Sequence, residues 1–252
     1  MDKTSPLDPG GAELQTCDLI AFGAGGREVP VALWWPAGET GASRGLVLVG
    51  HGGSQHKRAP AVIDVAETYA RHHGFAVAAI DGPVHGARRT DWGAPTKPAG
   101  ATVISDFRAL WRSDPQIEEM IEDWRAALTV IERTLGCTAN PIGWHGLSMG
   151  TAYGLPLCAA EPRIRAAVLG KWGTTHPHGD RLLDAARQTD AAILFQMMLE
   201  DEIFSREGQL TLFDAIRSRR KRLAGYPGRH GDPDEDQFND AARFLVQQLA
   251  GP

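Results

Sequence analysis

The chain has 252 residues, of which 42% are hydrophobic and 23% charged, and its formal net charge is -5. This composition is typical of a globular protein, and the length fits one α/β domain with a large core. The mildly acidic charge argues against nucleic acid or an anionic membrane as a partner, and no apolar run reaches the roughly 18 residues that would span a bilayer.

The beginning of the chain and the cysteines indicate where the protein works. Residues 1–12 are polar, with prolines and glycines, and lack the apolar core of a signal peptide. We expect a flexible tail there, followed by a single domain over residues 13–252. The cysteines, Cys17, Cys137 and Cys158, are odd in number and lack metal-ligand spacing. Unpaired, buried cysteines fit a reducing compartment, so the expected location is the cytoplasm.

The first half of the chain predicts strands separated by turns and one helix. Residues 14–22 and 29–35 have strand patterns, and the glycine cluster between them predicts a tight turn and an antiparallel pair. Residues 45–50 and 75–80 are apolar runs typical of buried strands, and a helix is expected between them, from about residue 60 to 72. Residues 81–115 are rich in Gly, Pro, Arg and Trp, which predicts a long functional loop over part of the active site.

The second half alternates helices with strands. Apolar residues recur every three or four positions from Ile117 to Leu135, which predicts an amphipathic helix ended by Gly136. Further strands are expected at 141–145, 165–169, 191–198 and 221–226, and helices at 151–160, 205–217 and 235–250. The alternation predicts an α/β fold with a mostly parallel, twisted sheet and helices on both faces. The segment 170–190 is too short for a large lid domain.

The pentapeptide Gly146-Leu147-Ser148-Met149-Gly150 carries the main chemical signal. It lies between a predicted strand and a predicted helix, which is the setting of a nucleophile elbow. Glycine at both flanks removes the Cβ atoms that would collide in so sharp a turn, and the helix start favours negative charge. Ser148 is therefore a candidate nucleophile. Chance alone would produce such a motif in roughly one chain in ten, so the interpretation needs support elsewhere.

That support comes from an acid and a histidine later in the chain. Asp201 follows the strand expected to end near residue 198, and His230 follows the one expected to end near 226. Open parallel sheets place their sites at the carboxyl ends of the strands, so both side chains should meet Ser148 there. The order Ser, Asp, His is also the order of elbow hydrolases, and serine needs such a base and orienting acid to act as a nucleophile.

The same edge should supply donors for an oxyanion hole and a lining for the substrate. One donor is expected to be the N–H of Met149, and the second the N–H of Gly53, with Ser54 as the alternative. Trp172 and His176 are candidates for the substrate pocket. The spacing of His176 and His178, without a third ligand, is a poor zinc signal. Neither a metal nor an organic cofactor is expected.

Five stretches of the chain resemble a known family. They are LVLVGHGG at 46–53, AIDGPVHGAR at 79–88, GWHGLSMG at 143–150, LFQMMLEDEIF at 194–204 and YPGRHG at 226–231. With them the chain resembles the α/β-hydrolase superfamily, and within it the dienelactone-hydrolase-like and small serine esterase group, over about residues 29–250. The resemblance implies Ser148 as nucleophile, Asp201 as acid and His230 as base.

The sequence departs from that family in two places. Many relatives have a glycine-rich turn before the acid, where this chain has Met198-Leu199-Glu200, so Glu200 and Glu202 compete with Asp201 for the role. Dienelactone hydrolases often carry a cysteine nucleophile, and the serine here favours an ester hydrolase. Arg88 and Arg89 could hold a substrate carboxylate, but a structural ion pair is favoured for them.

The expected function is a cytoplasmic serine hydrolase that cleaves small or medium carboxylic esters through an acyl-enzyme. Its partner would be a small-molecule ester, with no nucleic acid or membrane, and a homodimer is possible. A thioesterase, an amide or peptide hydrolase, or a C–C bond hydrolase would use the same triad. A non-catalytic binding protein of the same fold is a further alternative.

Overall fold

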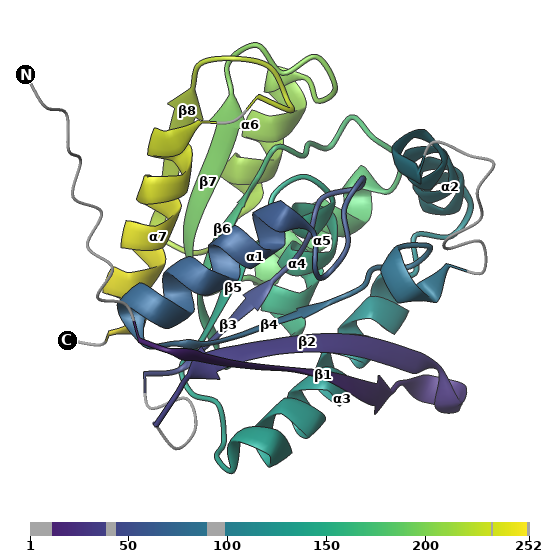
Figure 1. Cartoon of the computed structure of the whole chain (residues 1–252). Coiled ribbons are helices and arrows are strands. Elements are labelled where there is room, and N and C mark those ends of the chain that lie inside the picture. Colours follow the sequence, from purple (N-terminus) through teal and green to yellow (C-terminus); the bar gives the residue numbers. More distant parts are fainter. Residues whose placement is uncertain (1–11, 39–43, 90–98, 233, 251–252) are drawn as a thin grey trace, which may run out of the picture.

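The structure is a computed structural model that describes residues 12–38, 44–89, 99–232 and 234–250. The predicted tail at residues 1–12 lies almost wholly outside the described residues. The described chain forms one eight-stranded sheet with the order β1-β2-β4-β3-β5-β6-β7-β8 and helices on both of its faces (Figure 1). The predicted α/β fold is therefore confirmed.

The sheet is antiparallel at one edge and parallel through the rest. The strands are β1 (Leu14–Phe22), β2 (Glu28–Pro36), β3 (Leu46–Val49), β4 (Ala76–Ile80), β5 (Ile142–His145), β6 (Ile164–Gly170), β7 (Ala192–Met198) and β8 (Lys221–Tyr226). β1 pairs antiparallel with β2 across the short turn η1 (Ala24–Gly26), and β2 pairs antiparallel with β4. All pairings from β4 to β8 are parallel, so their carboxyl ends lie at one edge.

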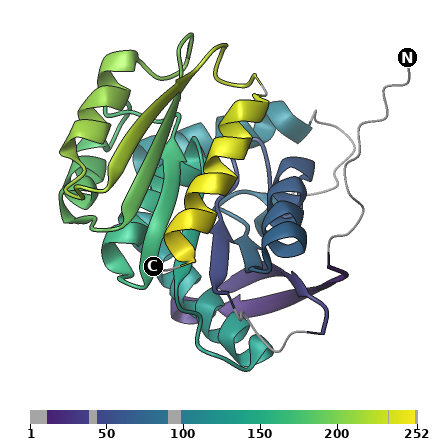
Figure 2. The ribbon, with the colours of Figure 1, turned by 90° about the vertical axis from the view of Figure 1, so that its left-hand side faces the viewer.

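Helices cover the sheet in two layers, each over its own apolar core. On one face lie α1 (Pro60–Glu67), its π-helical continuation η2 (Thr68–His72) and α7 (Glu235–Leu249), which Figure 2 shows in front. On the other face lie α3 (Ile117–Leu135), α4 (Met149–Ala160), α5 (Gly179–Gln188) and α6 (Arg206–Ala215). No helix among the described residues is both long and apolar enough to cross a membrane.

The segment predicted as a long loop contains a helix instead. Within residues 81–115 the chain forms the short turn η3 (Gly86–Arg88) and then α2 (Ala99–Ser113). Val103, Phe107 and Trp111 recur every fourth residue and are buried, so one narrow apolar row holds this helix against the domain. The segment 170–190 likewise contains α5, which the sequence analysis did not predict.

Candidate active site

The turn between β5 and α4 has the strained geometry that the pentapeptide predicts. Ser148 has φ 57° and ψ −121°, outside the regions that L residues ordinarily adopt. A Cβ on Gly146 would lie 2.7 Å from Trp144 Nε1, and one on Gly150 would lie 2.5 Å from the carbonyl oxygen of Gly50. Only glycine fits at both flanks of the serine.

Hydrogen bonds to the end of β6 hold this turn in place. The N–H of Ser148 donates to the carbonyl oxygen of Gly170 at 2.9 Å. Thr151 Oγ1 accepts the N–H of Gly170 at 2.7 Å and lies 2.6 Å from the Gly170 oxygen and 3.0 Å from the Gly146 oxygen. Backbone strain of this kind persists where the surroundings over-determine the conformation, and here they do so around a single hydroxyl.

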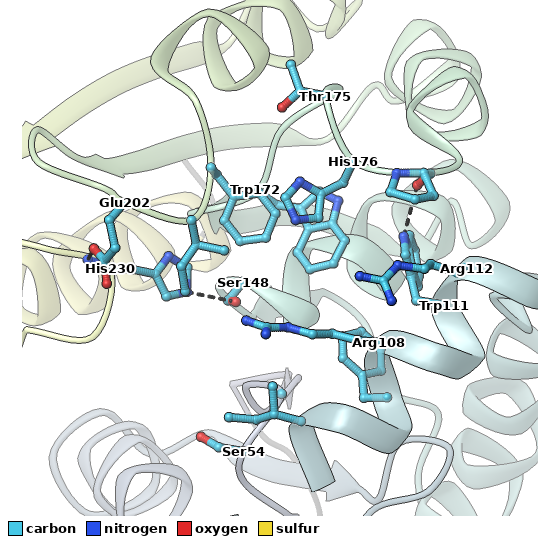
Figure 3. Close-up of a pocket in the computed structure, with 16 residues that line it drawn as sticks. Ser54, Arg108, Trp111, Arg112, Ser148, Trp172, Thr175, His176, Glu202 and His230 are labelled. Carbon is cyan, nitrogen blue, oxygen red and sulfur yellow. Dashed lines mark hydrogen bonds between the residues drawn. The ribbon is translucent and has the colours of Figure 1, made fainter. Parts of the chain in front are cut away.

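His230 and Asp201 join Ser148 in one hydrogen-bonded chain. His230 Nε2 lies 3.0 Å from Ser148 Oγ (Figure 3), and His230 Nδ1 lies 2.9 Å from Asp201 Oδ2. Asp201 comes from the loop after β7 and His230 from the loop after β8, so three segments distant in sequence meet at the carboxyl edge. A neutral imidazole satisfies both contacts, because Nδ1–H donates to the carboxylate while Nε2 accepts the serine proton.

The surroundings of Asp201 keep its carboxylate ionised. Burial raises the pKa of Asp201, but hydrogen bonds from His230 and from the N–H groups of Phe204 and Ile203 outweigh burial and hold that pKa below its ordinary value. Both N–H groups donate to Oδ1 at 2.9 Å, while Oδ2 faces the imidazole. The carboxylate can therefore orient the ring and stabilise its protonated form.

The two competing glutamates make other contacts. Glu202 Oε2 accepts the backbone N–H of His230 at 3.0 Å and lies 3.7 Å from Arg229 Nε. Glu200 is exposed, and its backbone N–H donates to the carbonyl oxygen of Gly228 at 3.0 Å. The imidazole Nδ1 thus has the carboxylate of Asp201 as its partner.

The two expected oxyanion donors are the residue after the serine, Met149, and a residue that lines the same cavity as the serine, Gly53. Met149 is the first residue of α4, so no preceding helical turn supplies a carbonyl oxygen for its N–H. Gly53 lines a cavity together with Ser148, and within the described part of the chain its N–H has no hydrogen-bond acceptor. A Cβ on Gly53 would lie 3.4 Å from the ring of Phe107, so the loop runs close under α2. The role of both N–H groups remains a prediction.

Two buried histidines support the loop that carries Gly53. His51 Nδ1–H donates to the carbonyl oxygen of Gly52 at 2.8 Å, and its Nε2 accepts the N–H of Gly82 at 2.9 Å. His85 Nε2 lies 3.0 Å from the carbonyl oxygen of Gly53. Burial, with the nearby His85, lowers the pKa of His51 to about 3, so this ring is neutral and acts as a brace.

A cavity of about 490 Å³ opens beside Ser148 and His230. Trp172 and His176, the two predicted pocket residues, both line it (Figure 3). Its other wall comes from the segment 81–115, which was expected to cover part of the active site as a loop and does so as the helix α2, with Ile104, Phe107, Arg108, Trp111 and Arg112. The four-residue spacing of Val103, Phe107 and Trp111 was the available signal for that helix.

A second cavity, of about 460 Å³, meets the first at the serine. Both are lined by Gly53, Ser54, Ser148 and His230, and the second extends between α1 and the start of α7. The serine hydroxyl therefore has space on two sides. Among the described residues, no group of three His, Cys, Asp or Glu side chains is placed to hold a metal ion.

The two arginines of the loop before α2 are engaged within the protein. Arg88 lies 2.8 Å from Asp123, which is itself buried in α3, and Arg89 lies 3.2 Å from Asp106. Neither arginine lines the cavity beside Ser148. The ion-pair interpretation is thus the one that the geometry supports.

Comparison with known proteins identifies the family. No family model and no curated protein matches the sequence. Among solved structures, a cold-adapted esterase from an Arctic intertidal metagenomic library is 32% identical, with 98% of each chain covered and a TM-score of 0.80. Two more distant neighbours share the fold. A putative dienelactone hydrolase from Klebsiella pneumoniae is 14% identical, with 96% of this chain and all of that chain covered and a TM-score of 0.73. An acetyl xylan esterase from Paenibacillus sp. R4 is 16% identical, with 98% of this chain and 86% of that chain covered and a TM-score of 0.69. The chain therefore belongs to the α/β-hydrolase superfamily, in its dienelactone-hydrolase-like and small esterase group, and is an enzyme of the carboxylic ester hydrolase class.

Proposed function

We infer that the protein is a serine esterase that works through an acyl-enzyme on Ser148, His230 and Asp201. The observation that carries this proposal is the unbroken hydrogen-bonded chain from the Ser148 hydroxyl through the imidazole to the Asp201 carboxylate. A nucleophile in contact with a base that is oriented by a third group is the arrangement that nucleophilic catalysis needs.

In the proposed reaction Ser148 Oγ attacks the ester carbonyl carbon while its proton moves to His230 Nε2. The carbonyl oxygen becomes an alkoxide, which the N–H groups of Gly53 and Met149 would stabilise. The bond to the alcohol oxygen then breaks, and the proton on Nε2 passes to that oxygen. A water molecule attacks the acyl-enzyme with the same base, which releases the acid and restores the serine.

The space around the serine supports esters of small or medium size. The two cavities of about 490 and 460 Å³ meet at Ser148, so the acyl half and the alcohol half can lie on opposite sides of the hydroxyl. Each volume is within the range of small-ligand pockets. Hydrogen bonds to Gly170 hold the strained turn, and His51 and His85 brace the loop of Gly53, which supports stabilisation of developing charge without rearrangement.

Replacement of the nucleophile tests this function most directly. In Ser148→Ala we expect kcat for p-nitrophenyl acetate to fall by roughly 10⁴- to 10⁶-fold, because only the oxyanion donors and binding would remain. The circular dichroism spectrum and the unfolding midpoint should stay close to those of the wild type. A fluorophosphonate probe should label the wild type at Ser148 and leave the variant unlabelled. Turnover near the wild-type level in Ser148→Ala would overturn the proposal.

A matched set of substrates separates esterase activity from its relatives. An ester, a thioester and an amide with the same acyl group should be compared by kcat/KM in the wild type. We expect the ester to be cleaved fastest, and all residual turnover to depend on Ser148. A preference for the thioester or the amide would keep the serine mechanism but change the substrate class.

A further inference from the structure

The wall of the cavity formed by α2 carries two arginines, Arg108 and Arg112, that pair with no acidic side chain among the described residues. Arg108 and Arg112 are four residues apart, so both lie on one side of the helix, and both line the cavity beside Ser148. Figure 3 shows the side chain of Arg108 running from α2 toward Ser148, with Arg112 next to Trp111. Within the described residues neither guanidinium has a recorded hydrogen bond or ion pair, in contrast to Arg88 and Arg89.

Unpaired arginines are common on protein surfaces, and their position is what matters here. Arg133, for example, is also exposed and unpaired within the described residues, but it lies on α3 and lines none of the cavities described above. Arg108 and Arg112 instead flank a cavity whose other members include the predicted nucleophile and base. Among the described residues that line it, the one carboxylate is Glu202, which already accepts the N–H of His230.

The charge of the two arginines extends across the cavity to its far wall. Burial lowers the pKa of His176, and the charges of Arg108 and Arg112 lower it further. His176 lies opposite α2, against the ring of Phe204. Both guanidinium groups therefore act on the same space, while the charge of Asp201 acts on His176 in the opposite direction.

The cavity that the arginines share with Ser148 has an aromatic lining, whose rings are largely buried against one another. Trp172 lies at its centre, with ring centroids 5.1 Å from Trp111, 6.4 Å from Phe107 and 4.6 Å from Phe204. Phe204 in turn lies 5.3 Å from the imidazole of His230. The Nε1–H of Trp111 donates to the carbonyl oxygen of Pro177 at 2.9 Å, which fixes that ring. Such a surface binds a flat ring by offset or edge-to-face contacts.

From these contacts we propose that the preferred substrate is an ester in which one half is an aromatic ring bearing an anionic group, such as a carboxylate. The ring lies against Trp172 and its neighbours, and the anion binds Arg108 and Arg112. Guanidinium groups bind carboxylates through paired, charge-assisted hydrogen bonds, which suits a pair of arginines on one helix face. This proposal rests on the proposed esterase function and makes the two arginines residues that determine specificity.

Two pairs of probes test the proposal, because the charged ring could belong to either half of the ester. The first pair is 4-carboxyphenyl acetate and 4-carbamoylphenyl acetate, and the second is methyl 4-carboxybenzoate and methyl 4-carbamoylbenzoate. Within each pair the probes have nearly the same shape and differ in charge. In the wild type we expect kcat/KM for the carboxylate to exceed that for the amide by about tenfold or more in one of the pairs.

Variants of the arginines separate recognition from intrinsic reactivity. Arg108→Gln and Arg112→Gln should each lower the carboxylate-to-amide ratio severalfold, and the double variant should remove the preference. Arg108→Lys should restore part of it, since a point charge replaces the paired donors. Arg133→Gln removes one exposed helical charge away from the cavity and should leave the ratio and the activity at wild-type levels. High salt should lower the ratio in the wild type, because it screens exposed charges.

An aliphatic anion tests the role of the ring. The methyl half-ester of adipic acid should be cleaved less efficiently than the preferred aromatic carboxylate, by about tenfold. Equal efficiency would overturn the aromatic part of the proposal.

A carboxylate-to-amide ratio of kcat/KM near one in both pairs would overturn the proposal that the substrate carries an anionic group. A preference for the carboxylate that survives in the double variant would overturn the role of the two arginines. Failure of the proposed function gives a different result, since the uncharged probes would then be cleaved as well by Ser148→Ala as by the wild type.

Discussion

Two groups of loops at the carboxyl edge of the sheet contain the same kinds of residue and differ in what those residues contact. The loops after β3 and β4 bring together Asp81, His51 and His85. The loops after β7 and β8 bring together Asp201 and His230. In the first group every recorded partner lies within the protein framework, whereas in the second the imidazole reaches a hydroxyl at the mouth of a cavity.

The first group is closed around its carboxylate. Asp81 is fully buried and accepts the N–H of Lys57 at 2.9 Å, the Lys57 ammonium at 2.8 Å and the N–H of Ala87 at 2.9 Å. The backbone of Gly86, with φ 49°, packs directly against this carboxylate, and a Cβ on Gly86 would lie 2.2 Å from Asp81 Oδ1. The position of an acid and a histidine at this edge is therefore not sufficient for chemistry. What distinguishes the second group is the ring nitrogen that faces Ser148 in the cavity.

The largest effect that would sharpen this comparison is expected in Asp201→Asn. An amide can donate to the ring nitrogen, which favours the tautomer that cannot accept the serine proton. We expect kcat for p-nitrophenyl acetate to fall on the order of 10⁴-fold, with the fold intact by circular dichroism. Steady-state kinetics with active-site titration would measure the change.

Glu200→Gln is the matched control for that variant, because it makes the same chemical change at an exposed neighbouring position. Its kcat should stay within about threefold of the wild type, as is usual for surface changes away from the chemistry. If Asp201→Asn kept its activity while Glu202→Gln lost it, Glu202 would be the acid and the comparison between the two groups would fail.

A change of the same kind in the first group should affect stability instead. Asp81→Asn removes the charge that pairs with Lys57 and one acceptor for buried donors, and breaking a buried ion pair costs about 3–5 kcal/mol. We expect about 3 kcal/mol, because the Lys57 side chain is 13% exposed and water can reach it. Urea unfolding would measure the loss, and kcat per folded molecule should change by less than about tenfold.

The exposed pair of Asp18 and Arg58 provides the control for that measurement. Asp18→Asn makes the same substitution where the carboxylate side chain is 64% exposed, and surface pairs contribute only about 0–1 kcal/mol. If Asp18→Asn and Asp81→Asn lost similar amounts of unfolding free energy, burial would not be what makes the Asp81 ion pair the stronger one. A fall of kcat by several orders of magnitude in Asp81→Asn would instead place the first group in the chemistry.

The order of the elements and the serine turn could be predicted because local patterns specify them. The helix from Ile117 to Leu135 and the strand from Lys221 to Tyr226 have the predicted bounds, since their periodicity or end signals are strong. The elbow was predictable because its close contacts require glycine at two fixed positions. Only glycine fits at residue 146 beside Trp144 and at residue 150 beside Gly50, and both glycines belong to the pentapeptide. Strand order then placed the loops with Asp201 and His230 at one edge.

The helix α2 was missed although its apolar residues Val103, Ile104, Phe107, Leu110 and Trp111 recur every three or four positions. Proline and glycine surround the segment, and these turn residues favoured the prediction of a loop. The burial of α2 depends on Trp172 and Tyr153, which are distant in sequence. The wall of the cavity therefore follows from tertiary contacts that no local window contains.

The smallest expected effect concerns a fourth histidine at this edge, His145, and it extends the comparison to the pH dependence of stability. His145 ends β5, is buried, and lies 3.0 Å from the Tyr69 hydroxyl through Nδ1. Burial lowers its pKa from 6.5 to about 4. Between these values the unfolded chain binds a proton that the folded chain does not, so stability is lost as the pH falls from about 6.5 toward 4.

His145→Gln should flatten that loss, because it removes the group that must charge on unfolding. The expected change is at most about 1.4 kcal/mol of unfolding free energy per pH unit between about pH 6.5 and 4, measured by urea unfolding at several pH values. A slope remains in the variant, since the pKa of His51 is also lowered by its burial. His72→Gln makes the same substitution at an exposed position of η2 and is the control for the loss of an imidazole. If the unfolding free energy of His145→Gln changed with pH as steeply as that of the wild type, His145 would titrate alike in the folded and unfolded chain. The contrast between the buried histidines and the one that faces Ser148 would then not extend to His145.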